Sequence, residues 1–345
     1  MTDLKKIIDE ELESMTFNEL RKRRSIKMKR NFRIKKITAV CAAVIAAAMA
    51  LAVSTSAMGL WSLPDFINRV FPDRNDEVQP YAFSSEISNG STEQFMLSAG
   101  NFICDGNNFV TEFLVTKADG SEFTQEELST LSFNDRLIFP DMTGIDSEVR
   151  NGGADCRISD DGLTFIITRT YNNLPRKIKS GDELQIKISG VQKWVVSNDN
   201  GSVDLQTIDD GTVLFNFSVP VIPKPIPLVF KNENGEKVFE AELTRLSITA
   251  VADESIFNGY ELLSDEISDY DAQIQWFESD FTTPKFYDEN MNLTDNAYNG
   301  YKCMKSLREK NASILFNDDP KLEKAKYIEW FGCIAEIPDM PEAEE

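Results

Sequence analysis

The spacing of hydrophobic residues changes several times along this chain. Near the N-terminus, apolar side chains recur at helical spacing, with acidic residues on the other faces, at Leu4, Ile7, Ile8, Leu12 and Met15. An uncharged run follows over residues 37–61, and a second short helical pattern covers residues 62–71. In that second pattern Ser62 precedes an early proline, which predicts a capped amphipathic helix of two turns.

Beyond this helix the period changes to two, which is typical of half-buried strands. The clearest alternating runs are Leu184, Ile186, Ile188 and Phe215, Phe217, Val219, Val221. Around Arg245 the parity of the apolar positions switches, which predicts a bulge or turn there. Many short strands separated by hairpin signals predict antiparallel β-sandwiches, and the signals are Asp105-Gly106, Asp119-Gly120, Asp161-Gly162, Asn200-Gly201, Asp210-Gly211 and Asn234-Gly235.

A stiff connection divides the β-rich part of the sequence. Three prolines lie within five residues between Val221 and Pro227, and we place a domain boundary in this stretch. The fold class expected is mainly β, with a cytoplasmic amphipathic helix, one transmembrane helix and two antiparallel β-sandwich-like extracytoplasmic domains. The expected parts are a cytoplasmic tail (1–36), the transmembrane helix (37–61), two β domains (62–222 and 223–337) and a disordered acidic tail (338–345).

Charge is distributed very unevenly around the uncharged run. Residues 21–36 contain ten Lys and Arg and no acid, and the 25 residues that follow contain no charge. As a helix they would extend about 37 Å, against about 30 Å for a hydrocarbon core. Residues 1–36 carry +6 and residues 62–345 carry −27. The basic flank predicts a cytoplasmic N-terminus and an exterior C-terminal bulk in the cell membrane, with Lys35, Lys36 and Trp61 at the interfaces.

A cleaved secretory signal is the alternative explanation of the apolar run. Thr55-Ser56-Ala57 offers small residues for cleavage after an alanine-rich core. However, apolarity resumes immediately afterwards and ends on Trp61, which favours a retained anchor.

The composition excludes several kinds of chemistry. The chain has no histidine, which removes Ser-His-Asp and Cys-His sites, His-ligated zinc and the commonest general base. Phosphate-loop, dinucleotide, hydrolase-elbow and CxxC motifs are missing too, and the acidic bulk disfavours direct binding of nucleic acid. The stretch 288–295 alternates oxygen side chains but lacks the glycine and glutamate of an EF-hand, so an ordinary polar loop is favoured. We expect no enzymatic activity, no metal and no cofactor.

Four cysteines lie in the predicted exterior. Two disulfides with three pairings are open to them, and Cys104 with Cys156 plus Cys303 with Cys333 would keep each bridge within one domain. Buried free thiols are the alternative, because domains of this size do not need disulfides.

The N-terminal helix needs a partner, because 36 residues cannot bury a core of their own. The inner leaflet and a cytosolic protein are the two available surfaces, and acidic residues at the centre of the helix favour the protein. Its binding stripe would comprise Leu4, Ile7, Ile8, Leu12, Met15 and Leu20.

The layout also resembles a known family. A short charged tail, a basic stop, an alanine-rich anchor, LWSLPDFINRVF and strands such as FMLSAGNFICDGNNFVTEFLVTKADG and DGTVLFNFSVPV are similar to the domain of unknown function 4179 family. These are single-pass Gram-positive membrane proteins treated as anti-sigma factors. The resemblance implies a cytoplasmic helix that sequesters an extracytoplasmic-function sigma factor, a β-rich exterior that senses an envelope condition, and thereby control of transcription. The tail departs from the zinc-containing anti-sigma type, since it has neither His nor Cys.

A different class of function stays open beside signalling. A membrane-anchored binding or adhesion module would use the exterior domains and leave the tail without a cytoplasmic role.

Overall fold

The structure, a computed structural model, describes residues 62–144, 147–150, 153–172, 174–196, 203–251, 283–294, 301–304, 311–316 and 320–338. The described residues all belong to one compact unit, Trp61–Glu345. The predicted cytoplasmic tail, the transmembrane helix and residues 339–345 therefore lie outside the described residues. Within the described ranges, no helix has the length and hydropathy needed to cross a membrane.

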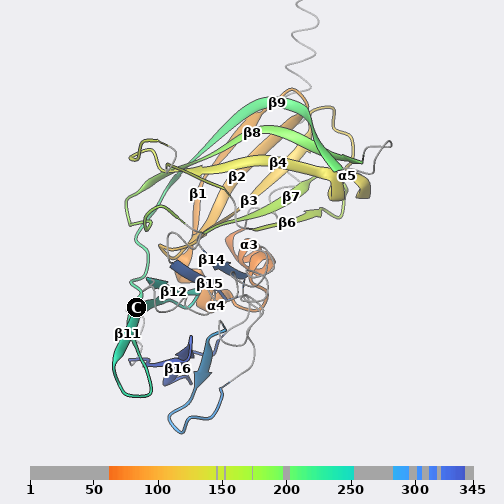
Figure 1. The fold of residues 1–345 in the computed structure, drawn as a ribbon. Helices are drawn as coiled ribbons and strands as arrows, with labels where there is room; N and C mark the ends of the chain where they lie inside the picture. The colour runs from red at the N-terminus through yellow and green to blue at the C-terminus, as the bar shows by residue number, and fades with distance from the viewer. Residues whose placement is uncertain are drawn as a thin grey trace, which may run out of the picture. The chain divides into compact units, whose positions relative to one another are not determined.

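The prediction of a mainly β protein with antiparallel sheets is confirmed. Two sheets form what we call the first β region (residues 82–219), and Figure 1 shows them as two layers. One has the order β1-β2-β3-β7-β6, with bounds Ala82–Ser91, Phe95–Cys104, Phe109–Lys117, Phe165–Tyr171 and Gly153–Ile158. The other has the order β5-β4-β8-β9, with bounds Glu148–Arg150, Leu131–Ile138, Glu183–Val196 and Val203–Ser218. A short helix, α5 (Gln125–Thr130), leads into β4 and begins with a capping box at Thr124.

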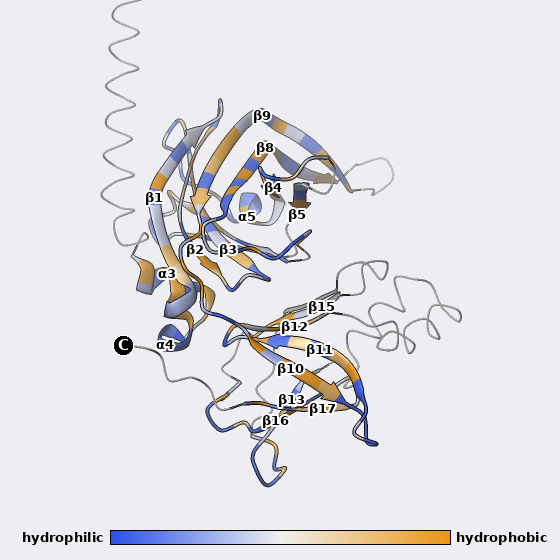
Figure 2. Cartoon of the chain, turned by 90° about the vertical axis from the view of Figure 1, so that its left-hand side faces the viewer, coloured by the Kyte–Doolittle hydropathy of each residue, from blue (hydrophilic) through white to orange (hydrophobic). Residues whose placement is uncertain are grey.

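The alternating residues of these strands build one core between the two sheets. Phe215 and Phe217, predicted as inward positions, are buried, and colouring by hydropathy shows the alternation along β9 (Figure 2). The ring of Phe217 lies edge-on to Phe102 and Phe109 of the opposite sheet, with centroids 5.5 and 5.4 Å apart. Edge-to-face contacts of this kind add to the free energy gained from burial alone.

A charged group also occupies an inward position of β4. Asp135 lies between Phe133 and Leu137 in the alternation and is 1% exposed. Its carboxylate accepts hydrogen bonds from Arg169 Nε (2.7 Å) and from the Tyr171 hydroxyl (2.5 Å), both on β7 of the other sheet. Asp135 therefore joins the two sheets from inside the core, through Arg169 and Tyr171.

The hairpin signals are confirmed at Asp105-Gly106, Asp161-Gly162 and Asn234-Gly235 and wrong at two other places. Asp119-Gly120 lies in a turn between β3 and α5. Asp105-Gly106 connects β2 and β3, with Gly106 at φ 93°, a conformation that suits glycine. Asp210-Gly211 instead lies inside β9, where the register shifts against β8. The strand bends there against the β1–β2 turn, and a Cβ on Gly211 would lie 2.7 Å from Thr92 Cβ, so close packing explains the glycine. Asn200-Gly201 lies outside the described residues.

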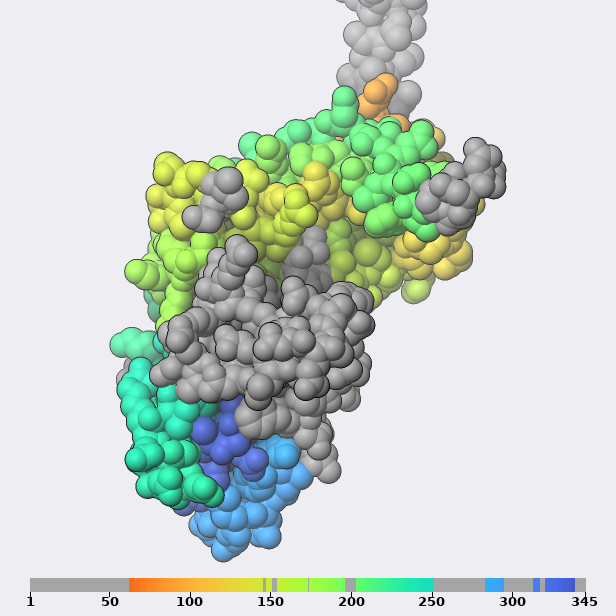
Figure 3. All heavy atoms as spheres, viewed as in Figure 1, coloured from red at the N-terminus to blue at the C-terminus, as the bar shows by residue number. Residues whose placement is uncertain are grey.

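The second β region (residues 226–338) consists, in its described parts, of one hydrogen-bonded sheet rather than the predicted sandwich of two. The strand order is β13-β16-β17-β10-β11-β12-β15-β14. The bounds are, in chain order, Ile226–Lys231, Lys237–Leu243, Ser247–Val251, Lys285–Tyr287, Tyr301–Met304, Asn311–Leu315, Tyr327–Trp330 and Cys333–Glu336. Strands β10 and β17 share one registered pair, Lys231 with Ile334. In space-filling view the atoms of β10–β11 lie beside those of the last described strands (Figure 3).

The core of the second β region is aromatic. Phe230 and Phe239 stack with ring centroids 4.4 Å apart, and Trp330 meets both at an angle. The predicted turn near Arg245 is confirmed, because β11 ends at Leu243 and β12 begins at Ser247. The division into domains 62–222 and 223–337 stays a prediction.

The bend in β9 yields a prediction about acid stability. Asp209 accepts hydrogen bonds from the main-chain N–H of Gln94 (2.8 Å) and of Gly211 (2.9 Å). Burial raises the pKa of the Asp209 carboxyl, but the hydrogen bonds from Thr92, Gln94 and Gly211 lower it more, so its pKa lies below the ordinary value. A lowered carboxyl pKa stabilises the fold above the unfolded pKa of about 3.9, and this contribution is lost as pH falls through the folded pKa.

We therefore expect Asp209→Asn to flatten the acid dependence of stability. Urea unfolding of the full-length protein in detergent, followed from about pH 5 to pH 2, measures this slope. The exposed neighbour provides the control, since Asp210→Asn removes the same charge without touching these amides. Equal slopes for Asp209→Asn and the wild type would contradict the prediction.

Candidate functional site

Residues 62–81 form a helical connector that begins one residue after the predicted membrane span ends. It comprises α3 (Leu63–Val70), α4 (Asn75–Val78) and the short 3-10 helix η1 (Gln79–Tyr81). The predicted cap is confirmed: the Ser62 hydroxyl accepts a hydrogen bond from the main-chain N–H of Asp65 (3.2 Å), and proline occupies the first turn. Phe66 and Ile67 are buried on one face of α3.

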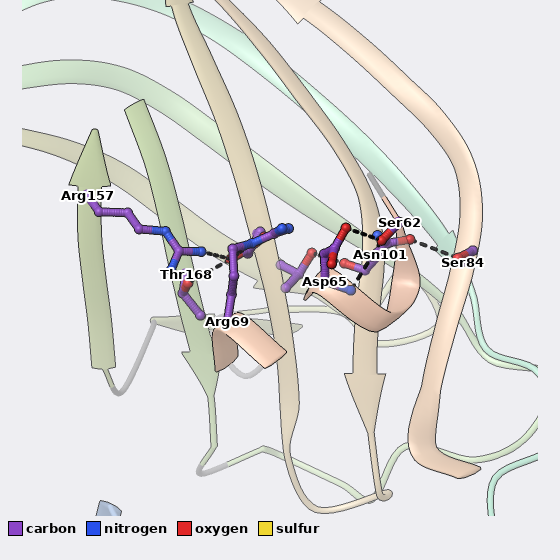
Figure 4. Close-up of polar contacts among 9 residues, drawn as sticks. Ser62, Asp65, Arg69, Ser84, Asn101, Arg157 and Thr168 are labelled. Carbon is purple, nitrogen blue, oxygen red and sulfur yellow. Dashed lines mark hydrogen bonds and ion pairs between the residues drawn. The ribbon is translucent and has the colours of Figure 1, made fainter. Parts of the chain in front are cut away.

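Two arginines bind one buried carboxylate where the connector meets the first β region. Glu112 lies on β3, is 2% exposed, and faces away from the core between the two sheets. Arg69 of α3 donates to it through Nε (3.1 Å) and Nη2 (2.7 Å), and Arg157 of β6 donates from the other side at 3.0 Å. Figure 4 shows the two arginines converging beside Thr168. Strong charge-assisted bonds thus fix the orientation of α3 on the sheet.

An apolar cluster joins the connector to both β regions. Its members come from the connector, from β1, β2 and β3, and from two places in the second β region, namely Leu246 and Leu315. The remaining buried members are Phe66, Ile67, Phe71, Val78, Tyr81, Ala82, Ile103 and Val110. We call this cluster, together with the polar contacts described next, the joint.

Arg74 is a buried, charged residue of the connector that lies in the joint. It is 2% exposed and lies between α3 and α4. Its guanidinium donates to the main-chain oxygens of Phe316 (2.5 Å), just after β15, and of Arg245 (2.7 Å), in the β11–β12 turn. It also lies 5.6 Å from the centroid of the Phe71 ring. One side chain therefore binds two separate segments of the second β region.

Asp105 makes the corresponding link from the first β region. One carboxylate oxygen accepts hydrogen bonds from the main-chain N–H groups of Asn107 (3.0 Å) and Asn108 (2.8 Å) in its own hairpin. The other accepts from the hydroxyls of Thr244 (3.1 Å) and Ser247 (2.5 Å) in the β11–β12 turn. Asp105 is 2% exposed, so these bonds replace the water that a buried carboxylate loses.

Tyr81, the last residue of the connector, also contacts the β11–β12 turn. Its hydroxyl accepts a hydrogen bond from the main-chain N–H of Arg245 (3.4 Å). Burial, together with the nearby Asp105 and against the bond from Arg245, raises the pKa of the Tyr81 hydroxyl. The side chain is therefore neutral at ordinary pH, as its apolar surroundings require.

The described cysteine side chains carry free thiols. Cys104, Cys156 and Cys333 are unpaired, and the side chain of Cys303 lies outside the described residues. The strand order opposes a bridge between Cys104 and Cys156, because β3 and β7 separate β2 from β6 by about 14 Å, well beyond the reach of a disulfide. Burial raises the pKa of all three thiols, most of all at Cys104, which makes them poor nucleophiles.

The acidic and cysteine side chains that the structure describes do not gather into a metal site. No group of three or more Cys, Asp or Glu side chains there could hold a metal ion. The carboxylate of Asp288, in the loop that resembled a calcium site, accepts hydrogen bonds from the main-chain N–H groups of Asn290 and Asn292. The joint holds three segments together, namely the connector, the first β region and the second β region.

The sequence-predicted binding residues and this joint are different sets. The partner stripe (Leu4, Ile7, Ile8, Leu12, Met15, Leu20) and the interface residues (Lys35, Lys36, Trp61) lie outside the described residues. Sequence reasoning missed Arg69, Arg74, Asp105 and Glu112. The available signal was an acidic residue inside an apolar strand: Glu112 interrupts FVTEFLV, and a buried charge at such a position requires a partner.

Comparisons with known proteins leave the family open. No family profile and no curated protein matches the sequence. Among solved structures, the conserved domain protein from Bacillus anthracis is similar over 75% of this chain and 78% of its own, with 11% identity and a TM-score of 0.41. A likeness at that level carries no argument about fold or function. The resemblance to the domain of unknown function 4179 family stays a prediction.

Removing the charge between the two arginines should loosen the connector. In Glu112→Gln, Arg69 and Arg157 lose their shared counter-ion, and the amide turns a donor toward one of them. We expect a loss of about 2–4 kcal/mol in the free energy of unfolding. Urea unfolding of the full-length protein measures it, with the exposed Glu86→Gln on β1 of the same sheet as the control. A loss below about 0.5 kcal/mol, the range of ordinary surface changes, would refute the prediction.

Proposed function

We propose that this chain is a single-pass membrane signalling protein. Its cytoplasmic helix holds an extracytoplasmic-function sigma factor at the membrane, and its two β regions, outside the cell, respond to an envelope condition. The reversal of charge across residues 37–61 supports the topology, and the apolar stripe of the tail supports a protein partner.

One structural observation carries the proposal. The residues that follow the predicted span are not a flexible linker. The helical connector begins at Ser62 and packs against both β regions. A module that only needed to be held at the surface would tolerate a polar linker of any length. A packed connector instead allows a change in the β regions to reach the span.

An adhesion module remains the second candidate, and one observation favours it. The far end of the β8–β9 hairpin exposes an apolar group on one face: Trp194 (43% exposed), Leu205 (42%) and Val203 (56%). Exposed apolar groups of this kind can mark binding surfaces. In this case the tail would serve topology alone, and deletion of residues 2–20 would leave the phenotype unchanged.

Substitutions in the tail separate the two candidates. We expect Ile8→Asp with Leu12→Asp to abolish capture of a sigma factor by full-length protein in the native cell, while insertion into the membrane is retained. Each buried aliphatic anchor contributes about 1.5–3 kcal/mol, so losing two weakens docking a hundredfold or more. Affinity capture with mass spectrometry provides the measurement.

The control changes the same helix on its other faces. Asp9→Asn with Glu13→Gln alters charge but leaves the apolar stripe intact, so capture of the sigma factor should persist. If wild type and both variants retain the same proteins and none is a sigma factor, the signalling proposal is wrong.

A further inference from the structure

The joint is asymmetric in how firmly it holds the connector. Toward the first β region the connector is continuous with β1, and Arg69 binds the buried Glu112. Toward the second β region it is held by Arg74, by Tyr81, and by the apolar contacts of Leu246 and Leu315. These second contacts all come from the β11–β12 turn and the end of β15.

We propose that the second β region is the gate of the helical connector: when the β11–β12 turn and the end of β15 leave Arg74 and Asp105, the connector loses its cover and its helices unfold. The purpose of this gate rests on the proposed signalling function, but the gate itself is a property of the exterior. Under this proposal, the second β region is the part that receives the signal.

Separation of the two β regions exposes fewer buried apolar residues than unfolding of either core. Two of the ten buried residues in the shared apolar cluster belong to the second β region. Each β region has its own, larger core, centred on Phe113 and Phe217 in the first and on Phe230 and Trp330 in the second. A ligand or force acting on the second β region would therefore break the joint before it disrupted either core.

The buried charge explains why the connector cannot stay folded when uncovered. Arg74 donates to the carbonyls of Arg245 and Phe316, and the loss of these two acceptors leaves buried N–H donors without those bonds, which costs free energy. The next residue upstream, Asp73, holds a left-handed backbone conformation at φ 61°. A residue other than glycine keeps such a conformation when its surroundings impose it. Releasing Arg74 removes one of those constraints at the bend between α3 and α4.

The contacts of Asp105 allow the gate to be tested by substitutions in the second β region alone. Thr244 and Ser247 belong to the second β region and donate to Asp105 of the first. Thr244→Val with Ser247→Ala removes these two bonds, together with the bonds that Thr244 Oγ1 accepts from the N–H groups of Leu246 (3.1 Å) and Ser247 (2.9 Å), without changing any residue of the connector. If the gate exists, the connector must respond to this distant change.

Hydrogen exchange of the full-length protein in lipid nanodiscs, read by mass spectrometry, is the experiment. We expect Arg74→Leu, and independently Thr244→Val with Ser247→Ala, to speed exchange in residues 62–81 by about tenfold or more, with peptides of β8 and β9 unchanged. Arg74→Lys, which keeps the charge but loses the two-pronged geometry, should give a smaller increase. Ser218→Ala, which removes an exposed hydroxyl on β9, is the control.

Two results would overturn the gate. Unchanged exchange in the connector after the Thr244 and Ser247 substitutions would show that the second β region does not control it. Exchange that rises equally in β8 and β9 would show that the joint supports the whole fold rather than gating one segment. Neither result involves a sigma factor, so failure of the gate is distinct from failure of the proposed function, which the capture experiment alone decides.

Discussion

A carboxylate removed from water has to find hydrogen-bond donors for both of its oxygens, and Asp105 finds them in two different parts of the chain. Its own hairpin supplies amides to one oxygen, and the β11–β12 turn supplies hydroxyls to the other. The side-chain amide of Asn108, in the same hairpin, also donates to both oxygens. Because donors from the hairpin and from the turn bind the same buried carboxylate, Asp105 links the β2–β3 hairpin to the second β region. Arg74 adds a second link, from the connector to the same turn.

Buried charges occur in this protein where separate segments meet. Asp135 with Arg169 joins the two sheets of the first β region, and Glu112 with Arg69 joins the connector to the outer face of one sheet. Apolar contacts supply most of the free energy of folding but are not directional. Ion pairs with fixed geometry specify which surfaces meet and in which orientation, at a cost in desolvation that makes them sensitive to the loss of one partner.

The two β regions contact the connector in different ways. The first β region is firmly attached to the connector through chain continuity and Glu112, whereas the second is attached through main-chain carbonyls and a small apolar contact. The proposed signalling function makes use of this difference, because a packed connector that follows the predicted span would let a change in the β regions reach the span.

The sequence by itself determined the local features: alternation in β9, the Ser62 cap, the turn at Arg245 and three of the six hairpin dipeptides. These depend on hydrogen bonds and side-chain spacing within a few residues. The prediction of a hairpin at Asp210-Gly211 was wrong. Gly211 is required by the close packing of β9 against the β1–β2 turn, which exists only in the folded structure. The partners of the buried charges were decided by tertiary structure alone. Arg69 finds Glu112 43 residues away, Ser247 finds Asp105 142 residues away, and Arg74 finds Phe316 242 residues away. Such pairs depend on which strands become neighbours, and the strand order is set by the packing of the whole core rather than by any local pattern.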